Sequence, residues 1–156
     1  NTFAFANTTS LQNVLELNKE VVIQDLSSQA IAALLQLVPT SVEHPIQVWD
    51  ACAASGGKTI LMFDTMSNIR MHLSDIRESI LLNADKRLQE AGIRPASVQV
   101  IDLTQPFDIK KPFDFVFADL PCSGSGSFGS GVTSVTIGLG SMSSSFSAAT
   151  TILLSL

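Results

Sequence analysis

The sequence of 156 residues holds only two cysteines and two histidines, one tryptophan and no tyrosine. Two cysteines are too few for a disulfide framework, which favours a reducing, cytoplasmic compartment. No apolar run reaches the roughly 18 residues that span a bilayer, and the N-terminus lacks the basic start of a signal peptide. A net charge of −5 argues against a chain that grips nucleic acid by charge alone. We therefore expect a cytoplasmic protein with no membrane partner and no metal centre.

Charged residues are also missing from one whole region, residues 120–156. Within it, 18 of the 25 residues from Ser123 to Ser147 are Ser, Gly or Thr, which is low-complexity composition typical of a linker. This change divides the chain into a lead-in (1–20), a core (21–128) and a low-complexity tail (129–156). The tail still contains two runs of β-propensity, 132–140 and 150–156, and either is able to pair with an open sheet edge.

The core alternates between two hydrophobic periodicities. A helical spacing ends at Pro39, which stops the helix. Strand-like runs and helical runs then follow one another, and Gly92 is a natural helix stop. Such alternation predicts an α/β fold with a parallel sheet. The expected helices contain Ile31 to Val38, 58–66 and 77–92, and the expected strands are 46–52, 69–75, 97–102 and 113–119.

Each predicted strand ends at or close to an aspartate: Asp50, Asp75, Asp102 and Asp119. In open parallel sheets the ligand lies beyond the carboxyl ends of the strands, so four acids there indicate a shared site. The alternative is that aspartate simply favours the turns that follow strands.

The stretch "DACAASGGKT", residues 50–59, follows the first predicted strand. Its Lys58-Thr59 pair suggests a phosphate loop, with "FVFAD" supplying a metal-holding acid. That motif needs a glycine at position 52, where this chain has Cys52, and the dinucleotide fingerprint is absent too. A phosphate loop is therefore the less favoured interpretation.

Small residues between a strand and a helix also allow a ligand to approach the backbone closely, beside the N–H groups of a helix N-terminus. Asp75 follows Gly57 by 18 residues, a separation at which a carboxylate accepts hydrogen bonds from ribose hydroxyls. Asp102, on the third strand, is able to accept from an adenine amino group. A ligand with ribose and adenine but no required pyrophosphate is S-adenosylmethionine (SAM).

Three segments together resemble a known family, the Sun/Fmu-type RNA cytosine-5 methyltransferases, relatives of small-subunit rRNA methyltransferase B and the Nop/NSUN proteins. The family pattern D-x-C-A-A-P-G-G-K-T is similar to residues 50–59, "QDLSSQ" (24–29) matches the family's lead-in, and "DLPCSGSG" (119–126) matches its D-x-P-C-S-G. The resemblance covers about residues 21–128. It implies a Rossmann-like class I SAM-dependent methyltransferase core that acts on RNA, with rRNA the expected substrate.

The resemblance also implies roles for individual residues. A cysteine thiolate adds to C6 of cytosine, C5 takes the methyl group, and proton loss at C5 expels the cysteine. Asp119 holds the cytosine edge and also borders the cofactor, and Cys122 helps to release the product. The implied cofactor-binding residues are Cys52, Ala53, Ala54, Ser55, Gly56, Gly57, Lys58, Asp75, Asp102 and Asp119.

The chain departs from the family pattern in two places. Ser55 replaces the loop proline, which leaves the loop its shape with less rigidity. Nothing after Phe128 matches, and the family's attacking cysteine, which lies further along the chain, has no counterpart. We therefore expect a truncated core whose sheet is incomplete at its C-terminal end, which binds SAM but does not turn over. The alternatives are a nucleotide-binding phosphate-loop protein and a fold remnant without a ligand.

Overall fold

The computed structural model describes residues 4–6, 8–11, 13–24, 26–39, 41–108, 112–120 and 135–139. Within these ranges the helices and strands alternate as the sequence predicts. The second β-prone run, 150–156, lies outside the described residues. In chain order the elements are α1 (Leu26–Ala30), α2 (Ala32–Leu35), β1 (Ile46–Asp50), α3 (Gly57–Thr65), β2 (Ile69–Asp75), α4 (Glu78–Glu90), β3 (Ser97–Val100), β4 (Phe115–Asp119) and β5 (Val135–Leu139).

The strands form one sheet in the order β3-β2-β1-β4-β5. β1 to β4 are parallel, with Asp50 opposite Leu73 on β2 and Phe117 on β4. β5 pairs with β4 in the antiparallel sense. The parallel α/β fold is thereby confirmed, and so is the prediction that part of the 132–140 run pairs with the sheet edge.

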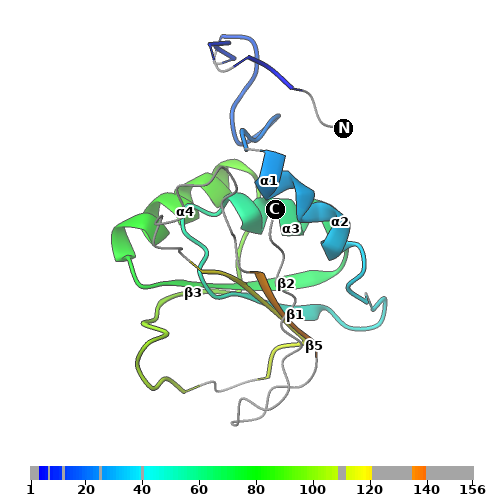
Figure 1. The fold of residues 1–156 in the computed structure, drawn as a ribbon, viewed down its shortest axis with the longest axis vertical. Helices are drawn as coiled ribbons and strands as arrows, with labels where there is room; N and C mark the ends of the chain where they lie inside the picture. Colours follow the sequence, from blue (N-terminus) through cyan, green and yellow to red (C-terminus); the bar gives the residue numbers. More distant parts are fainter. Residues whose placement is uncertain are drawn as a thin grey trace, which may run out of the picture.

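All four labelled helices lie on one face of the sheet (Figure 1). The main apolar core fills the layer between the helices and the sheet, because alternate strand residues face the helices. Val48, Leu73 and Phe115 from the strands are fully or almost fully buried there. The helices contribute Leu35, Met62 and Leu88 to the same cluster.

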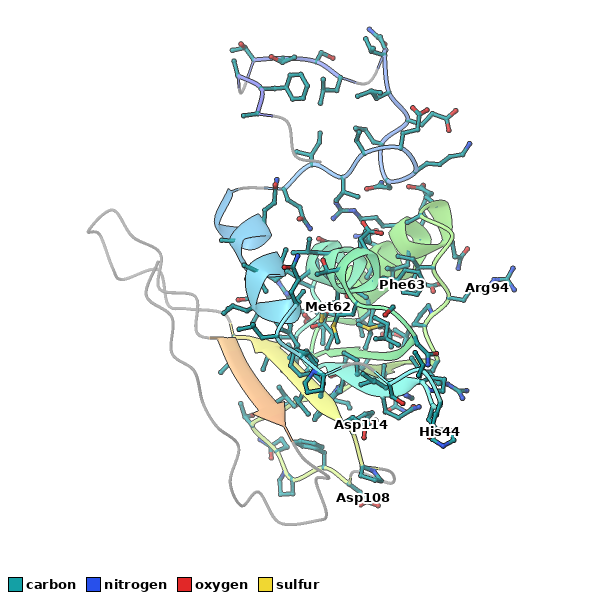
Figure 2. The ribbon with its side chains drawn as sticks, turned by 90° about the vertical axis from the view of Figure 1, so that its right-hand side faces the viewer. His44, Met62, Phe63, Arg94, Asp108 and Asp114 are labelled. Atoms are coloured by element: carbon teal, nitrogen blue, oxygen red, sulfur yellow. The ribbon has the colours of Figure 1, made fainter. Side chains whose placement is uncertain are left out.

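The described residues place no helix on the other face of the sheet (Figure 2). The segment between β3 and β4 passes over it, and its described residues, 101–108 and 112–114, form no helix. This segment, which carries Asp108 and Asp114, lies on the side away from the helices (Figure 2). A second, smaller apolar cluster forms beneath it around Trp49 and Val116.

The helix predicted to contain Ile31 to Val38 ends earlier than expected: α2 covers only Ala32–Leu35, and α1 lies before it at Leu26–Ala30. The reason is local. After Leu35 the backbone switches to tighter bonds, from Leu37 N to Leu34 O and from Val38 N to Leu35 O. Pro39 also disfavours helical geometry in the residue before it. The burial of Val38 is retained all the same.

The predicted end of α4 at Gly92 is confirmed. Gly92 has a φ of +74°, Ile93 N donates to Leu88 O, and Gly92 N donates to Gln89 O. This pair of bonds satisfies the last helix carbonyls, and the left-handed residue it needs is favourable only for glycine. The helix therefore ends where the chain must turn toward β3.

Three strands are shorter than predicted: β4 begins at Phe115, two residues late, and β1 and β3 end early. β1 ends at Asp50, because Ala51 and Cys52 already belong to a turn. β3 ends at Val100, so Asp102 lies two residues beyond it. There the Asp102 carboxylate accepts hydrogen bonds from the backbone N and hydroxyl of Thr104 and forms a turn.

Candidate cofactor site

The candidate site lies at the carboxyl ends of the parallel strands. β1, β2 and β4 end at Asp50, Asp75 and Asp119. From β1 the strand order runs to β2 and β3 on one side and to β4 on the other, so it reverses between β1 and β4. Ligands of open α/β sheets bind at such a reversal of strand order. Three of the four predicted acids therefore share one edge. Asp102 lies at the outer end of that edge, beyond β3.

The loop between β1 and α3, residues 51–56, folds back onto the end of β2. Ala53 N donates to Ser74 O at 2.9 Å, and Ala54 N donates to Asp75 Oδ2 at 3.0 Å. Ala54 has a φ of +46°, which is uncommon for a residue with a Cβ. The contacts with β2 hold this unfavourable conformation in place.

Gly56 connects this loop to α3. Its φ of +78° lies in the left-handed region, and its N donates to Ala53 O. A Cβ at this position would stand 3.4 Å from Ala84 Cβ on α4. Gly56 therefore serves both the turn and the close approach of α3 to α4. The first carbonyl of α3, on Gly57, accepts a 2.5 Å hydrogen bond from Gln24 Nε2 of the lead-in motif.

Asp75 is 5% exposed and accepts hydrogen bonds on both of its oxygens. Oδ1 accepts from the backbone N and the Nε of Arg77, and Oδ2 accepts from Arg77 Nη2 and Ala54 N. Burial alone would raise the pKa of this carboxyl, but the hydrogen bonds from Arg77 and Ala54 outweigh it and lower the pKa. Asp75 is therefore a carboxylate at neutral pH.

Asp50 is 1% exposed and has the opposite electrostatic character. Oδ2 accepts a 2.6 Å hydrogen bond from Thr59 Oγ1, whereas Oδ1 is buried and accepts none within the described residues. Burial raises the pKa of Asp50 to about 7, with the Thr59 hydrogen bond opposing it and the Asp119 charge adding to it. An unpaired carboxylate oxygen thus lies beneath the loop.

Lys58 and Asp119 form an ion pair between α3 and the end of β4. Both side chains are partly buried, with 23% and 22% of their surface exposed. The pair spans the point where the strand order reverses. It brings the lysine of the glycine-rich loop together with the acid that precedes the Pro-Cys pair.

Cys52 lies among these acids and is partly buried. Burial, followed by the charges of Asp75, Asp50 and Asp119, raises the pKa of its thiol to about 11. It is therefore a neutral thiol at physiological pH and a poor nucleophile. The other predicted cysteine, Cys122, lies outside the described residues, as does Pro121.

Several residues of the site were not predicted. Thr59 and Gln24 lay inside the quoted motifs without an assigned role. Ser74 had a usable signal, because a polar residue just before the strand-end acid interrupts an apolar strand. Ile76, directly after Asp75, is 57% exposed and offers an apolar surface at the same edge. Ser55, which was among the predicted cofactor-binding residues, is exposed in the loop.

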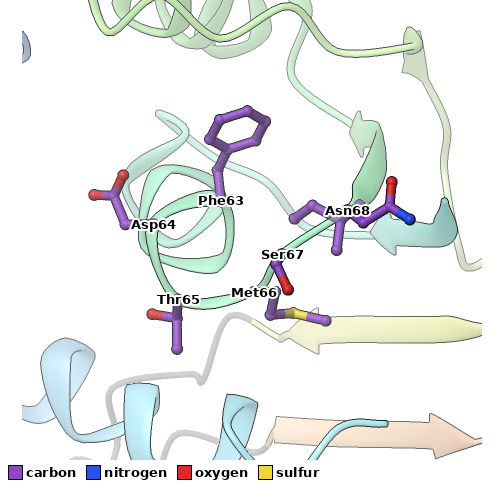
Figure 3. A pocket seen from close by; sticks show the side chains of 7 residues that line it. Phe63, Asp64, Thr65, Met66, Ser67 and Asn68 are labelled. Carbon is purple, nitrogen blue, oxygen red and sulfur yellow. The ribbon is translucent and has the colours of Figure 1, made fainter. Parts of the chain in front are cut away.

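A pocket of about 490 Å³ lies elsewhere, at the far end of α3 (Figure 3). Residues 63–69, from the end of α3 to the start of β2, line it. This is the opposite edge of the sheet from the four acids, because β2 begins at Ile69 and ends at Asp75. Phe63 and Asp64 point in different directions from the helix, and among the described residues only this one stretch of chain lines the pocket (Figure 3). The carboxyl edge is therefore the candidate site.

The described residues contain no group of three or more His, Cys, Asp or Glu able to hold a metal ion. In the same part of the chain, no helix has both the length and the apolar character needed to cross a bilayer.

The sheet has the Rossmann-like fold that SAM-dependent methyltransferases have. A solved SAM-dependent O-methyltransferase from Thermotoga maritima superposes with a TM-score of 0.50 at 20% identity, over 71% of this chain and 39% of that one. At this identity the likeness supports the fold alone.

The family follows from the sequence. The family model described as 16S rRNA methyltransferase RsmB/F matches residues 32–131, and the chain belongs to this family. Ribosomal RNA small subunit methyltransferase B of Xylella fastidiosa is 32% identical over 109 residues, and that of Escherichia coli is 32% identical over 108 residues. These alignments cover 69% and 68% of this chain, which spans only 24% of each relative's length.

Proposed function

We propose that this chain is the SAM-binding part of an RNA cytosine-5 methyltransferase that acts on rRNA. One observation carries the proposal: the glycine-rich loop is held against Asp75 at the end of β2 through the Ala54 N–H, at the carboxyl edge of the parallel strands. The family matches add the reaction class, because they are rRNA methyltransferases. Since the chain spans a quarter of its relatives, the RNA target belongs to the proposal too.

The residues at this edge fit the cofactor. SAM carries ribose, adenine and two positively charged groups. Asp75 is ionised and suits the ribose hydroxyls, which would take the place of the exposed Arg77 side chain on its oxygens. Exposed Ile76 beside it suits a face of the adenine ring. Asp102 keeps one carboxylate oxygen without a hydrogen bond in the described part of the chain and suits the adenine amino group. The unpaired Oδ1 of Asp50 lies beneath the loop, where positive charge is favourable.

The other residues of the site act on the base. When bound, SAM supplies the methyl group. We assign Asp119 to the junction between cofactor and cytosine, because its ion pair with Lys58 places it beside the loop. Cys122 follows Asp119 by three positions and is assigned to product release. Cys52 stays a thiol, so it does not replace the attacking cysteine that this sequence lacks.

Calorimetric titration with SAM and with S-adenosylhomocysteine tests this function. We expect the parental chain to bind both and to transfer no methyl group to rRNA. Asp75→Ala should weaken binding by roughly 10- to 100-fold, because it removes charge-assisted hydrogen bonds worth about 1.5–3 kcal/mol each. Asp85→Ala is the matched control, since Asp85 lies on α4 and bonds only to Gln89 within the described residues.

The rival functions give different results in the same experiment. A phosphate-loop protein would bind ATP with magnesium and lose that binding on Lys58→Ala. A fold remnant would give no heat and no thermal shift with any of these ligands at millimolar concentration. Either result would overturn the proposal.

A further inference from the structure

Ser74 is a fully buried polar residue at the penultimate position of β2. Its hydroxyl joins two groups that are distant in the sequence. Trp49 Nε1 donates to Ser74 Oγ at 3.0 Å, and Ser74 Oγ lies 2.9 Å from Ala51 O. An indole nitrogen can only donate a hydrogen bond, so Ser74 must accept from Trp49. The single hydroxyl proton is therefore directed at the Ala51 carbonyl.

Ser74 also holds the loop through its backbone. Its carbonyl accepts from Ala53 N at 2.9 Å, and the next residue, Asp75, accepts from Ala54 N at 3.0 Å. The last two residues of β2 thus fix three backbone groups of the loop, at positions 51, 53 and 54. These bonds hold Ala54 at its positive φ, which would otherwise relax.

Trp49 carries this connection to the opposite face of the sheet. Its ring stacks on Phe113 at 5.3 Å between centroids and meets Phe107 edge-on at 5.7 Å. Both phenylalanines belong to the segment that begins beside Asp102 and crosses that face. The hydroxyl of Ser74 therefore links this aromatic cluster to the loop by hydrogen bonds, in addition to the apolar packing of Ala51 in the same cluster.

We propose that Ser74 is a positioning residue for the cofactor, and that its hydroxyl holds the Ala51 carbonyl so that the loop is preorganised for SAM. The proposal rests on the proposed function. Without the hydroxyl, the Trp49 N–H and the Ala51 carbonyl lose their shared partner inside a buried layer. The loop then occupies the binding conformation for only a fraction of the time. The apparent Kd is the intrinsic Kd divided by that fraction, so it rises.

The test compares Ser74→Ala with Ser97→Ala by titrating each with S-adenosylhomocysteine. Ser97 is the matched control, because its hydroxyl bonds to His72 Nδ1 at 2.8 Å on β3's side of the sheet and does not contact the loop. We expect Ser74→Ala to raise the Kd about tenfold, as loss of a buried hydrogen bond implies, and Ser97→Ala to stay within about twofold. Circular dichroism checks that both variants are folded.

Trp49 supplies a second readout, because it is the only tryptophan and the chain has no tyrosine. In the parental chain, ligand binding should change the Trp49 emission. In Ser74→Ala that change should be lost even at saturating ligand, which a merely destabilised protein would not show. Should Ser74→Ala fail to fold, Ser74→Cys takes its place, since a thiol is a near-isosteric but weak donor, and should raise the Kd severalfold.

The outcomes separate the two proposals. If the parental chain binds and the Ser74 variant binds within twofold of it with the emission change intact, Ser74 is not a positioning residue and the proposed function stands. If the parental chain does not bind, both proposals fall.

Discussion

The amino and carboxyl ends of the parallel strands differ in the number of elements that contribute residues to each, and pocket volume does not show this difference. The amino end has a pocket of about 490 Å³, but seven consecutive residues line it and its one acid, Asp64, has only a pKa raised by burial. The carboxyl end brings together groups from β1, β2, α3 and β4, including two buried acids and a loop with positive φ at Ala54 and Gly56. A ligand site is marked by convergence of groups from several elements and by local strain, more than by volume.

The largest effect expected from this contrast is that of Gly56→Val. A β-branched residue at a φ of +78°, packed against Ala84, should lower the free energy of unfolding by about 2–4 kcal/mol. It should also abolish binding of S-adenosylhomocysteine. Urea denaturation and calorimetry measure the two effects.

Gly92→Val is the control for this change. Gly92 has a similar φ of +74°, so valine would suffer nearly the same backbone strain there, but its Cβ would meet nothing within 4 Å. We expect a loss of only about 1–2 kcal/mol and unchanged binding. Equal losses of binding in the two variants would show that the conformation of Gly56 is not specifically required for ligand binding.

The next effect is on the pH dependence of stability, and it comes from Asp50. Its pKa of about 7 in the folded chain lies above the ordinary value of 3.8, so the folded state binds more protons than the unfolded state between these values. That stabilisation is lost as the pH rises through 7, by about 2–3 kcal/mol between pH 5 and pH 8. Asp75 has a lowered pKa and acts only at more acidic pH, where its contribution is lost as the pH falls.

Asp50→Asn should flatten this profile while keeping an acceptor for the Thr59 hydroxyl. Denaturant unfolding at the two pH values measures the difference. A parental chain that is equally stable at pH 5 and pH 8 would mean that Asp50 ionises freely and is not the buried group described above.

The smallest expected effect belongs to the amino end. Asp64→Ala removes the acid of the pocket but touches no residue of the loop. Its Kd for S-adenosylhomocysteine should stay within about twofold of the parental value, and its stability within about 0.5 kcal/mol. A loss of affinity comparable to that of Asp75→Ala would remove the distinction between the two ends.

The features that are local in the sequence were predictable. Each strand-end acid is predicted by an apolar run followed by polar residues. The helix end at Gly92 is predicted because the last carbonyls of a helix need hydrogen-bond donors, which a left-handed glycine allows. The same local rules placed Asp102 on the third strand. That was wrong in detail, because Thr104 draws the Asp102 side chain into a turn.

The features that depend on strand order were not predictable. Lys58 pairs with Asp119 across 61 positions because β4 lies beside β1, and no local pattern specifies that order. Ser74 meets Ala51 for the same reason, since its role depends on β2 lying on the other side of β1. The family resemblance predicted which residues form the candidate site, and the strand order determines which of them contact one another.

The most direct test of the site is a map of backbone amide shifts while S-adenosylhomocysteine is added to the chain. The predicted result is a single group of shifted amides at residues 51–58, 74–77 and 101–104. A group centred on residues 63–69, or shifts scattered over both ends of the sheet, would contradict the assignment of the carboxyl edge as the cofactor site.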